Sequence, residues 1–287
     1  MEFRTVSTLD EALAELDERG GDTAVLAGGT DFTIQYLRGE LRPASVLHIE
    51  RVEQLKSVTN GSGLRLGALV THRQLSTDAQ VVRHASAVAE AAATVGGWQT
   101  MAVGTVGGNV CNASPAADVV PALLVHEAEA VLASKQGGER RVPLDRFILG
   151  RRRVDRRPTE LLASLALAAP PPRTGDAYVK VGRRGAMEIA IVGLAARLTF
   201  DESGVVRDAR LAVGSMASTA VRLPTAESAL VGTSLDSGAL DEAGRLLLEA
   251  VNPIDDVRGS AAYRRAVAPR VLARAAELCR QRALAGA

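Results

Sequence analysis

Cysteine and aromatic residues are scarce in this sequence. Aromatic residues make up 3% of the 287 residues, and Cys111 and Cys279 are the two cysteines. Two thiols are too few for a disulfide framework, a four-cysteine zinc site or an iron–sulfur cluster. The four histidines are scattered, without the spacing of a zinc-binding helix. The sequence therefore predicts no metal site in this chain.

The sequence also lacks an excess of either charge and any long apolar run. Lys and Arg number 34 against 33 for Asp and Glu, so the net charge of +1 is not that of a nucleic-acid-binding protein. No apolar segment is long enough to span a membrane, and residues 1–5 do not begin a signal peptide. Hydrophobic residues at 47% and charged residues at 23% are typical of globular proteins. We expect a soluble cytoplasmic protein that binds no nucleic acid.

Residues 1–57 show the pattern of a small parallel α/β unit. A helix is predicted between the capping residues Ser7 and Thr8 and the stop signal at Gly20 and Gly21. A strand at 24–26, a helix at 32–38 and a strand at 46–49 follow.

Residues 58–169 are predicted to form a second unit. A hairpin is expected around 60–63, helices over 85–95 and from Asp118, and another hairpin around 136–138. The intervening stretch, residues 96–112, is rich in glycine and has almost no periodicity. We expect a long functional loop there.

The proline triplet at 170–172 marks the best candidate boundary, because three fixed φ angles and three missing donors interrupt a helix or central strand. Residues 173–287 then form a third predicted unit. Strands are expected near 178–181, 191–200 and 205–213, followed by helices over 240–250 and 267–278. Pro269 is expected to kink or delimit the last helix.

Two glycine clusters, residues 27–31 and 104–109, each combine glycines with a threonine. Glycine allows positive φ and close approach of a ligand, so successive backbone N–H groups can converge on phosphate oxygens. Neither cluster contains Lys or Arg, which favours binding of a pyrophosphate by amides over binding by a charge clamp. The alternative is that both are tight turns, with Asp31 capping the helix it precedes. The lysine-containing mononucleotide motif and the dinucleotide fingerprint spacing are both absent.

Both clusters lie in longer runs, residues 25–31 and 104–118, that resemble the FAD-binding medium subunit of the molybdenum hydroxylases. That family includes xanthine dehydrogenase and aerobic carbon monoxide dehydrogenase. The resemblance extends in order through residues 147–150, 160–162, 178–184 and 256–265, and so covers nearly the whole chain. It implies an α+β fold with two FAD-binding subdomains of the vanillyl-alcohol oxidase type and a small C-terminal sheet-and-helix domain.

The resemblance also implies a set of FAD-binding residues in the cleft. For the pyrophosphate these are Val25, Leu26, Ala27, Gly28, Gly29, Thr30, Asp31, Phe32, Thr105, Gly107, Gly108 and Asn109. Asp118 would bond the adenosine portion, Leu162 would pack near the nucleotide and Lys180 would lie close to the flavin. The alternatives are a helix cap for Asp118, strand core for Leu162 and a solvated strand position for Lys180.

One segment departs from related chains. Residues 99–102 read Gln-Thr-Met-Ala, where relatives often carry an arginine and an asparagine. A cation and an amide donor are therefore missing. Trp98 next to them could stack on the flavin or belong to the core.

Five arginines lie within residues 151–157. The first interpretation is a solvated loop. The alternative is a docking surface for an acidic partner or a guide for an anionic electron acceptor.

By resemblance, the chain is expected to be an electron-transfer subunit. A large molybdenum-binding subunit would oxidise the substrate, a small iron–sulfur subunit with [2Fe-2S] clusters would relay electrons, and FAD here would pass them to a terminal acceptor. Two alternatives stay open: a self-sufficient flavin oxidase or reductase of the same fold, and a flavin-free interaction module. The sequence identifies neither the substrate nor the acceptor.

Overall fold

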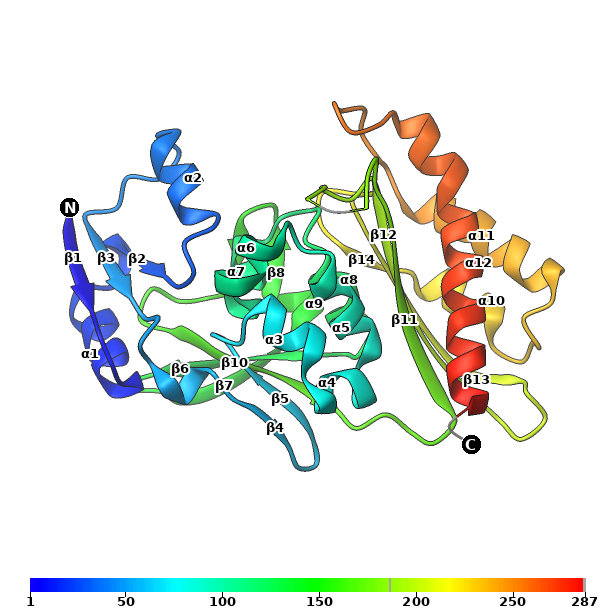
Figure 1. Cartoon of the computed structure of the whole chain (residues 1–287), viewed down its shortest axis with the longest axis horizontal. Helices are drawn as coiled ribbons and strands as arrows, with labels where there is room; N and C mark the ends of the chain where they lie inside the picture. The colour runs from blue at the N-terminus through cyan, green and yellow to red at the C-terminus, as the bar shows by residue number, and fades with distance from the viewer. Residues whose placement is uncertain (186, 286–287) are drawn as a thin grey trace.

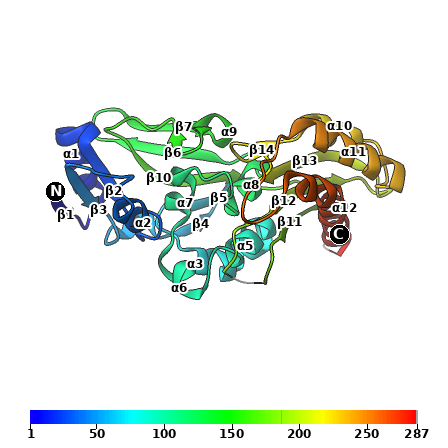
Figure 2. The same ribbon diagram turned by 90° about the horizontal axis from the view of Figure 1, so that it is seen from above.

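The computed structural model describes residues 1–185 and 187–285. They form three successive lobes along one long axis, from the N-terminal sheet to the C-terminal helices (Figures 1 and 2). Each predicted unit contains its own sheet. The domain limits themselves remain predictions.

The first lobe is a three-stranded parallel sheet in the order β1 (Glu2–Thr5), β3 (Ser45–His48), β2 (Thr23–Leu26). Helix α1 (Leu9–Arg19) begins at a capping box in which Thr8 and Glu11 bond each other's backbone N–H, and Gly20 ends it. The predicted helix, strands and parallel pairing are thus confirmed. Strand β1 was not predicted. Helix α2 (Phe32–Leu37) has no fully buried residue.

The second lobe is built on a five-stranded antiparallel sheet in the order β4, β5, β10, β6, β7. Both predicted hairpins are present. The strands are β4 (Val58–Asn60), β5 (Gly63–Gly67), β6 (Glu129–Ser134), β7 (Gly138–Pro143) and β10 (Leu161–Ala168), with a small pair β8 (Ile148–Gly150) and β9 (Arg153–Val154). The helices are α3 (His72–Thr77), α4 (Ala79–His84), α5 (Ser86–Ala93), α6 (Trp98–Val103), α7 (Val106–Asn112), α8 (Val119–Val125) and α9 (Leu144–Phe147).

The expectation of a long structureless loop over residues 96–112 is wrong. Helices α6 and α7 occupy most of it, and the hydroxyl of Thr105 caps α7 by accepting a hydrogen bond from Gly108 N–H. The glycines that hide the helical signal are required by packing: a Cβ on Gly107 would lie 2.7 Å from the Cβ and carbonyl oxygen of Ala68. Tertiary contact therefore outweighs the weak helix propensity of this segment.

The third lobe is a four-stranded antiparallel sheet in the order β11 (Thr174–Val181), β12 (Val192–Phe200), β13 (Val206–Gly214), β14 (Val221–Arg222). Helices α10 (Pro224–Leu230), α11 (Ser237–Ala250) and α12 (Ala261–Ala285) cover one face of it (Figure 1). Pro269 lies inside α12 and does not delimit it. No helix in the described part of the chain is long and apolar enough to cross a membrane.

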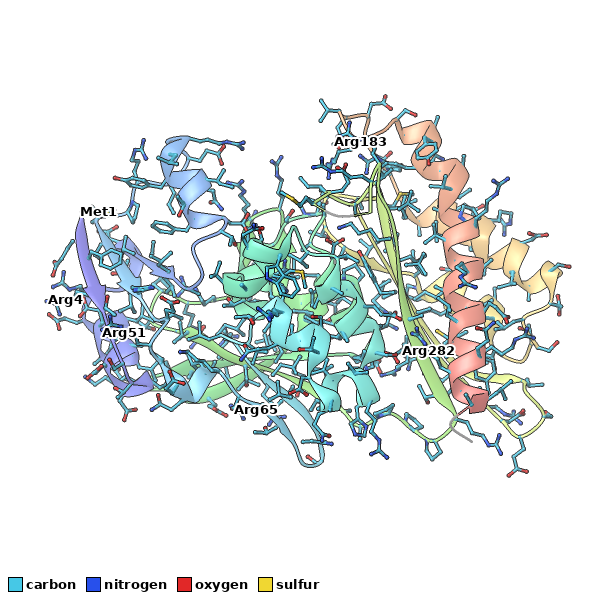
Figure 3. All side chains as sticks on the ribbon, viewed as in Figure 1. Met1, Arg4, Arg51, Arg65, Arg183 and Arg282 are labelled. Atoms are coloured by element: carbon cyan, nitrogen blue, oxygen red, sulfur yellow. The ribbon has the colours of Figure 1, made fainter. Side chains whose placement is uncertain are left out.

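The other face of the third sheet packs on the second lobe. Tyr178, Ala195 and Ala212 are buried in the same hydrophobic cluster as residues of α5 and α8. Asp176 on β11 caps α5 from across this interface: its carboxylate accepts hydrogen bonds from Ser86 Oγ at 2.7 Å and Ala87 N at 2.7 Å. Arg282 of α12 reaches the same place (Figure 3), where it pairs with Glu90 of α5. The second and third lobes are therefore joined by both apolar and charged contacts.

Candidate cofactor site

A cavity of about 730 Å³ collects residues from all three lobes, a size usual for small-molecule and cofactor sites. Thirteen of the fifteen predicted site residues line it: Val25, Ala27, Gly28, Gly29, Thr30, Asp31, Phe32, Thr105, Gly107, Gly108, Asn109, Asp118 and Leu162. Leu26 and Lys180 do not. The structure thus brings the two glycine clusters into one wall, although Gly28 and Gly104 are 76 positions apart in the sequence.

The two glycine turns touch each other. A Cβ built on Gly28 would lie 1.7 Å from the carbonyl oxygen of Val103 and 3.2 Å from the backbone nitrogen of Gly104. Only glycine at position 28 permits this approach, since real Cβ contacts under 3.0 Å essentially never occur. Gly29 has φ of +72°, which also favours glycine. The first cluster is therefore more than a generic tight turn.

Backbone amides are available in the first turn and engaged in the second. The backbone N–H groups of residues 28–32 donate no hydrogen bond to any other described residue. In α7, by contrast, Val106 N donates to Val70 O, Gly107 N to Ala68 O and Gly108 N to Thr105 Oγ1. The first turn therefore has amides available for a phosphate group, whereas the amides of residues 106–108 in the second turn are engaged within the protein, and binding of a phosphate by either turn stays a prediction.

Asp31 and Asp118 both precede a helix, and neither caps it. Among the described residues, neither carboxylate accepts a hydrogen bond from the backbone N–H groups at the start of its helix. Burial raises the pKa of Asp31 at the cavity wall, and the positive charge of Arg152 opposes that rise. The capping alternative is therefore wrong for both residues.

Asp118 belongs instead to a buried charged cluster that joins the cavity to the third lobe. Its carboxylate accepts hydrogen bonds from Tyr178 Oη at 2.7 Å and Lys180 Nζ at 2.8 Å. Lys180 also donates to Thr94 O, and its side chain is 10% exposed, so it is not a solvated strand position. Burial raises the pKa of Asp118, while Lys180 and Tyr178 oppose the rise. Lys180 therefore stands behind Asp118 and fixes it.

Leu162 is a strand-core residue, as one of its two interpretations predicts, and its packing near a nucleotide stays a prediction. It is 3% exposed, belongs to the hydrophobic cluster of the second lobe and also lines the cavity. Trp98, by contrast, is 63% exposed and does not belong to the core, and the guanidinium of Arg73 lies 4.3 Å from its ring centre.

Sequence reasoning missed two arginines in the cavity wall. Arg152 and Arg156 line it, so the run at 151–157 is not simply a solvated loop. Arg156 donates to the carbonyl oxygen of Glu160 at 2.6 Å, and Arg152 pairs with Glu40 at 2.7 Å. No local signal separates these two from the other arginines of the run.

Two further polar groups at the cavity were also missed. His72 is 2% exposed, and burial lowers its pKa to about 4, so it is neutral at physiological pH. Its Nδ1 atom and Asn109 Oδ1 are buried without a hydrogen-bond partner among the described residues. Such orphaned groups are uncommon in folded proteins and fit a site that binds a polar ligand.

The third lobe completes the wall through residues 187–189, which precede β12. Met187, Glu188 and Ile189 line the cavity, and Met187 N donates to Gly96 O at 3.0 Å. Arg183, which follows β11, lies at the upper edge of the sheet (Figure 3).

Comparisons with known proteins agree with this geometry. Residues 1–170 match the family described as the FAD binding domain in molybdopterin dehydrogenase, and residues 177–278 match the CO dehydrogenase flavoprotein C-terminal domain. The xanthine dehydrogenase FAD-binding subunit of Escherichia coli O157:H7 is 31% identical, over 91% of this chain and 90% of that protein. The 6-hydroxypseudooxynicotine dehydrogenase complex subunit alpha of Paenarthrobacter nicotinovorans is 30% identical, over 96% and 94%.

Solved structures are equally similar in fold. The carbon monoxide dehydrogenase from Hydrogenophaga pseudoflava that lacks the Mo-pyranopterin moiety superposes with a TM-score of 0.92 at 29% identity, covering 98% of both chains. Quinoline 2-oxidoreductase from Pseudomonas putida 86 gives 0.91 at 25% identity, covering 99% of this chain and 98% of that one. The chain therefore belongs to the FAD-binding medium subunits of the molybdopterin dehydrogenases, of the carbon monoxide dehydrogenase and xanthine dehydrogenase type.

Proposed function

We propose that this chain holds FAD in the cavity and passes electrons through it, from an iron–sulfur partner subunit to a terminal acceptor. The observation that carries the proposal is the contact between the two glycine turns at Gly28 and Val103 within one cavity wall. When bound, FAD supplies the redox chemistry, and the protein supplies binding and electrostatics.

The residues present fit that cofactor. The free N–H groups of residues 28–32 are donors suited to a diphosphate bridge. Asn109 offers an amide oxygen with no partner among the described residues, and Asp118 offers a carboxylate already fixed by Tyr178 and Lys180. Such acceptors suit the N–H and hydroxyl groups of an adenosine or a flavin.

The proposal places substrate oxidation in a partner. The chain holds two free cysteines, Cys111 and Cys279, too few to ligate an iron–sulfur cluster. Two similar proteins are named as the medium chain of a carbon monoxide dehydrogenase and the FAD-binding subunit of a xanthine dehydrogenase. By analogy, a large molybdenum-binding subunit and a small [2Fe-2S] subunit are expected to assemble with this chain.

Exposed apolar side chains on elements at the cavity support such an assembly. Leu37 on α2 is 77% exposed, Trp98 on α6 63%, Met187 63% and Ile189 56%. Solvent-exposed apolar groups that gather near a site commonly mark a protein–protein contact. A subunit that delivers electrons to the flavin must dock near the same opening.

The test is to purify the chain with its partners from its native source and to measure FAD, molybdenum and iron. We expect one FAD per chain, with both metals in the partner subunits. Flavin with no partner and no metal would support the self-sufficient oxidase or reductase instead. A complex without flavin, in which added FAD gives no thermal shift, would leave an interaction module.

A further inference from the structure

We propose that Arg152 is a binding residue for the diphosphate of the cofactor, acting as a cation between the two glycine turns. This inference rests on the proposed function and adds a charged contact to it. The relevant ligand chemistry is a nucleotide diphosphate bridge.

The backbone of Arg152 adopts an unusual conformation next to the end of α7. Its φ of +57° lies in the left-handed region, which non-glycine residues rarely adopt and which costs about 1 kcal/mol or more. Its N–H donates to the carbonyl oxygen of Ala113, which follows α7 and also has positive φ. Its positive charge also acts on Asp31 in the first turn, where it lowers the pKa of the carboxyl group against the effect of burial. Arg152 therefore lines the same cavity as residues of both glycine turns.

The charges of the cavity require such a cation. Asp31, Asp118 and Glu188 contribute three carboxylates to the wall, against the two guanidinium groups of Arg152 and Arg156. Asp118 is paired with Lys180, and Glu188 lies 3.5 Å from Arg183. Asp31 forms no ion pair within 4.0 Å among the described residues and would repel a phosphate group next to it.

The hydrogen bonds of the second turn lead to the same conclusion. Because the N–H groups of residues 106–108 are bonded within the protein, the second turn adds few donors to those of the first. A guanidinium has five donors, and one nitrogen of Arg152 is bonded to Glu40 at 2.7 Å. The remaining N–H groups can serve a phosphate. Glu40 orients the guanidinium of Arg152, and the Arg152 side chain is still 41% exposed.

The experiment compares Arg152→Gln with Arg151→Gln and Arg153→Gln in the complete complex. Residues 151 and 153 are exposed, belong to the same run and do not line the cavity. After removal of bound flavin, FAD is titrated by fluorescence at several salt concentrations. We expect the FAD dissociation constant to rise about tenfold or more in Arg152→Gln alone, with a weaker dependence on salt. Arg152→Lys should recover part of the affinity.

Riboflavin, which has no phosphate, is the second probe. Its affinity should be equal in the wild type and in Arg152→Gln, because the lost contact is to the diphosphate. Equal FAD affinity and salt dependence in all three glutamine variants would overturn the role of Arg152. A wild-type complex that binds no FAD at all would instead overturn the proposed function, so the two failures are distinguishable.

Discussion

Replacement of Asp176 by asparagine should weaken the interface between the second and third lobes. Burial raises the pKa of Asp176, but hydrogen bonds from His126, Ser86 and Ala87 N outweigh it and lower the pKa to about 2, from the ordinary 3.8. A carboxylate whose folded pKa is lowered stabilises the protein above its unfolded pKa. The difference corresponds to about 2 kcal/mol at neutral pH, lost as the pH falls from about 4 towards 2.

Urea denaturation followed by circular dichroism can measure this effect. At pH 7 we expect Asp176→Asn to unfold with a free energy about 2 kcal/mol below that of the wild type. By pH 3 the wild type should already have lost about 1 kcal/mol of the contribution, so the two proteins converge. Asp241→Asn, at an exposed position of α11, is the matched control and should match the wild type at each pH. Equal stabilities at pH 7, or a gap that does not narrow in acid, would refute the reasoning.

Three further substitutions test the cavity wall. Gly108→Val should abolish FAD retention, which FAD content measures. It should leave the fold intact, because Gly108 is exposed and a Cβ there would approach only Thr105 Oγ1, at 3.0 Å; circular dichroism checks the fold. Gly28→Ala should lose both FAD and about 1–3 kcal/mol of stability, since its Cβ would overlap the backbone of Val103; an unchanged melting temperature would contradict the contact between the turns. In the wild type, the free energy of unfolding should fall by about 3 kcal/mol between pH 6.5 and 4, because protonation of the buried His72 ring opposes folding. His72→Gln should remove most of this pH dependence. Identical pH profiles of the two proteins would contradict the role of His72.

Much of the secondary structure could be predicted because it depends on local patterns. The capping box at Thr8, the hairpin around residues 60–63 and the strand over 192–200 each follow from periodicity or turn chemistry within a few residues. Strand β1 was not predicted. All four of its residues are exposed, so its sequence lacks the alternation of buried apolar and exposed polar positions that indicates a strand. Helices α6 and α7 were not predicted, because the glycine and threonine residues of this segment have low helix propensity and give a weak helical pattern.

The candidate site was predictable where glycines mark it and unpredictable where side chains enter from elsewhere. Gly28 and Gly108 carry a signal in the sequence because they belong to two clusters, residues 27–31 and 104–109, that each combine glycines with a threonine. Arg152 carries none, because Arg151 and Arg153 on either side of it have the same chemistry and do not line the cavity. His72 carries none either: its neutral state follows from burial, which only the folded chain creates.

The wall of the cavity also explains why the third lobe matters to a site formed mainly by the first two. Asp118 directly precedes α8 in the second lobe, but the groups that fix its carboxylate, Tyr178 and Lys180, come from β11. The same strand also carries Asp176, two residues before Tyr178, and Asp176 caps α5. A β-strand places residues 176, 178 and 180 on one face, so a single strand both joins the lobes and fixes the cavity carboxylate. Loosening the cap at Asp176 should therefore disturb Asp118 as well as stability, a coupling that the C-terminal lobe could not exert if it were only a scaffold.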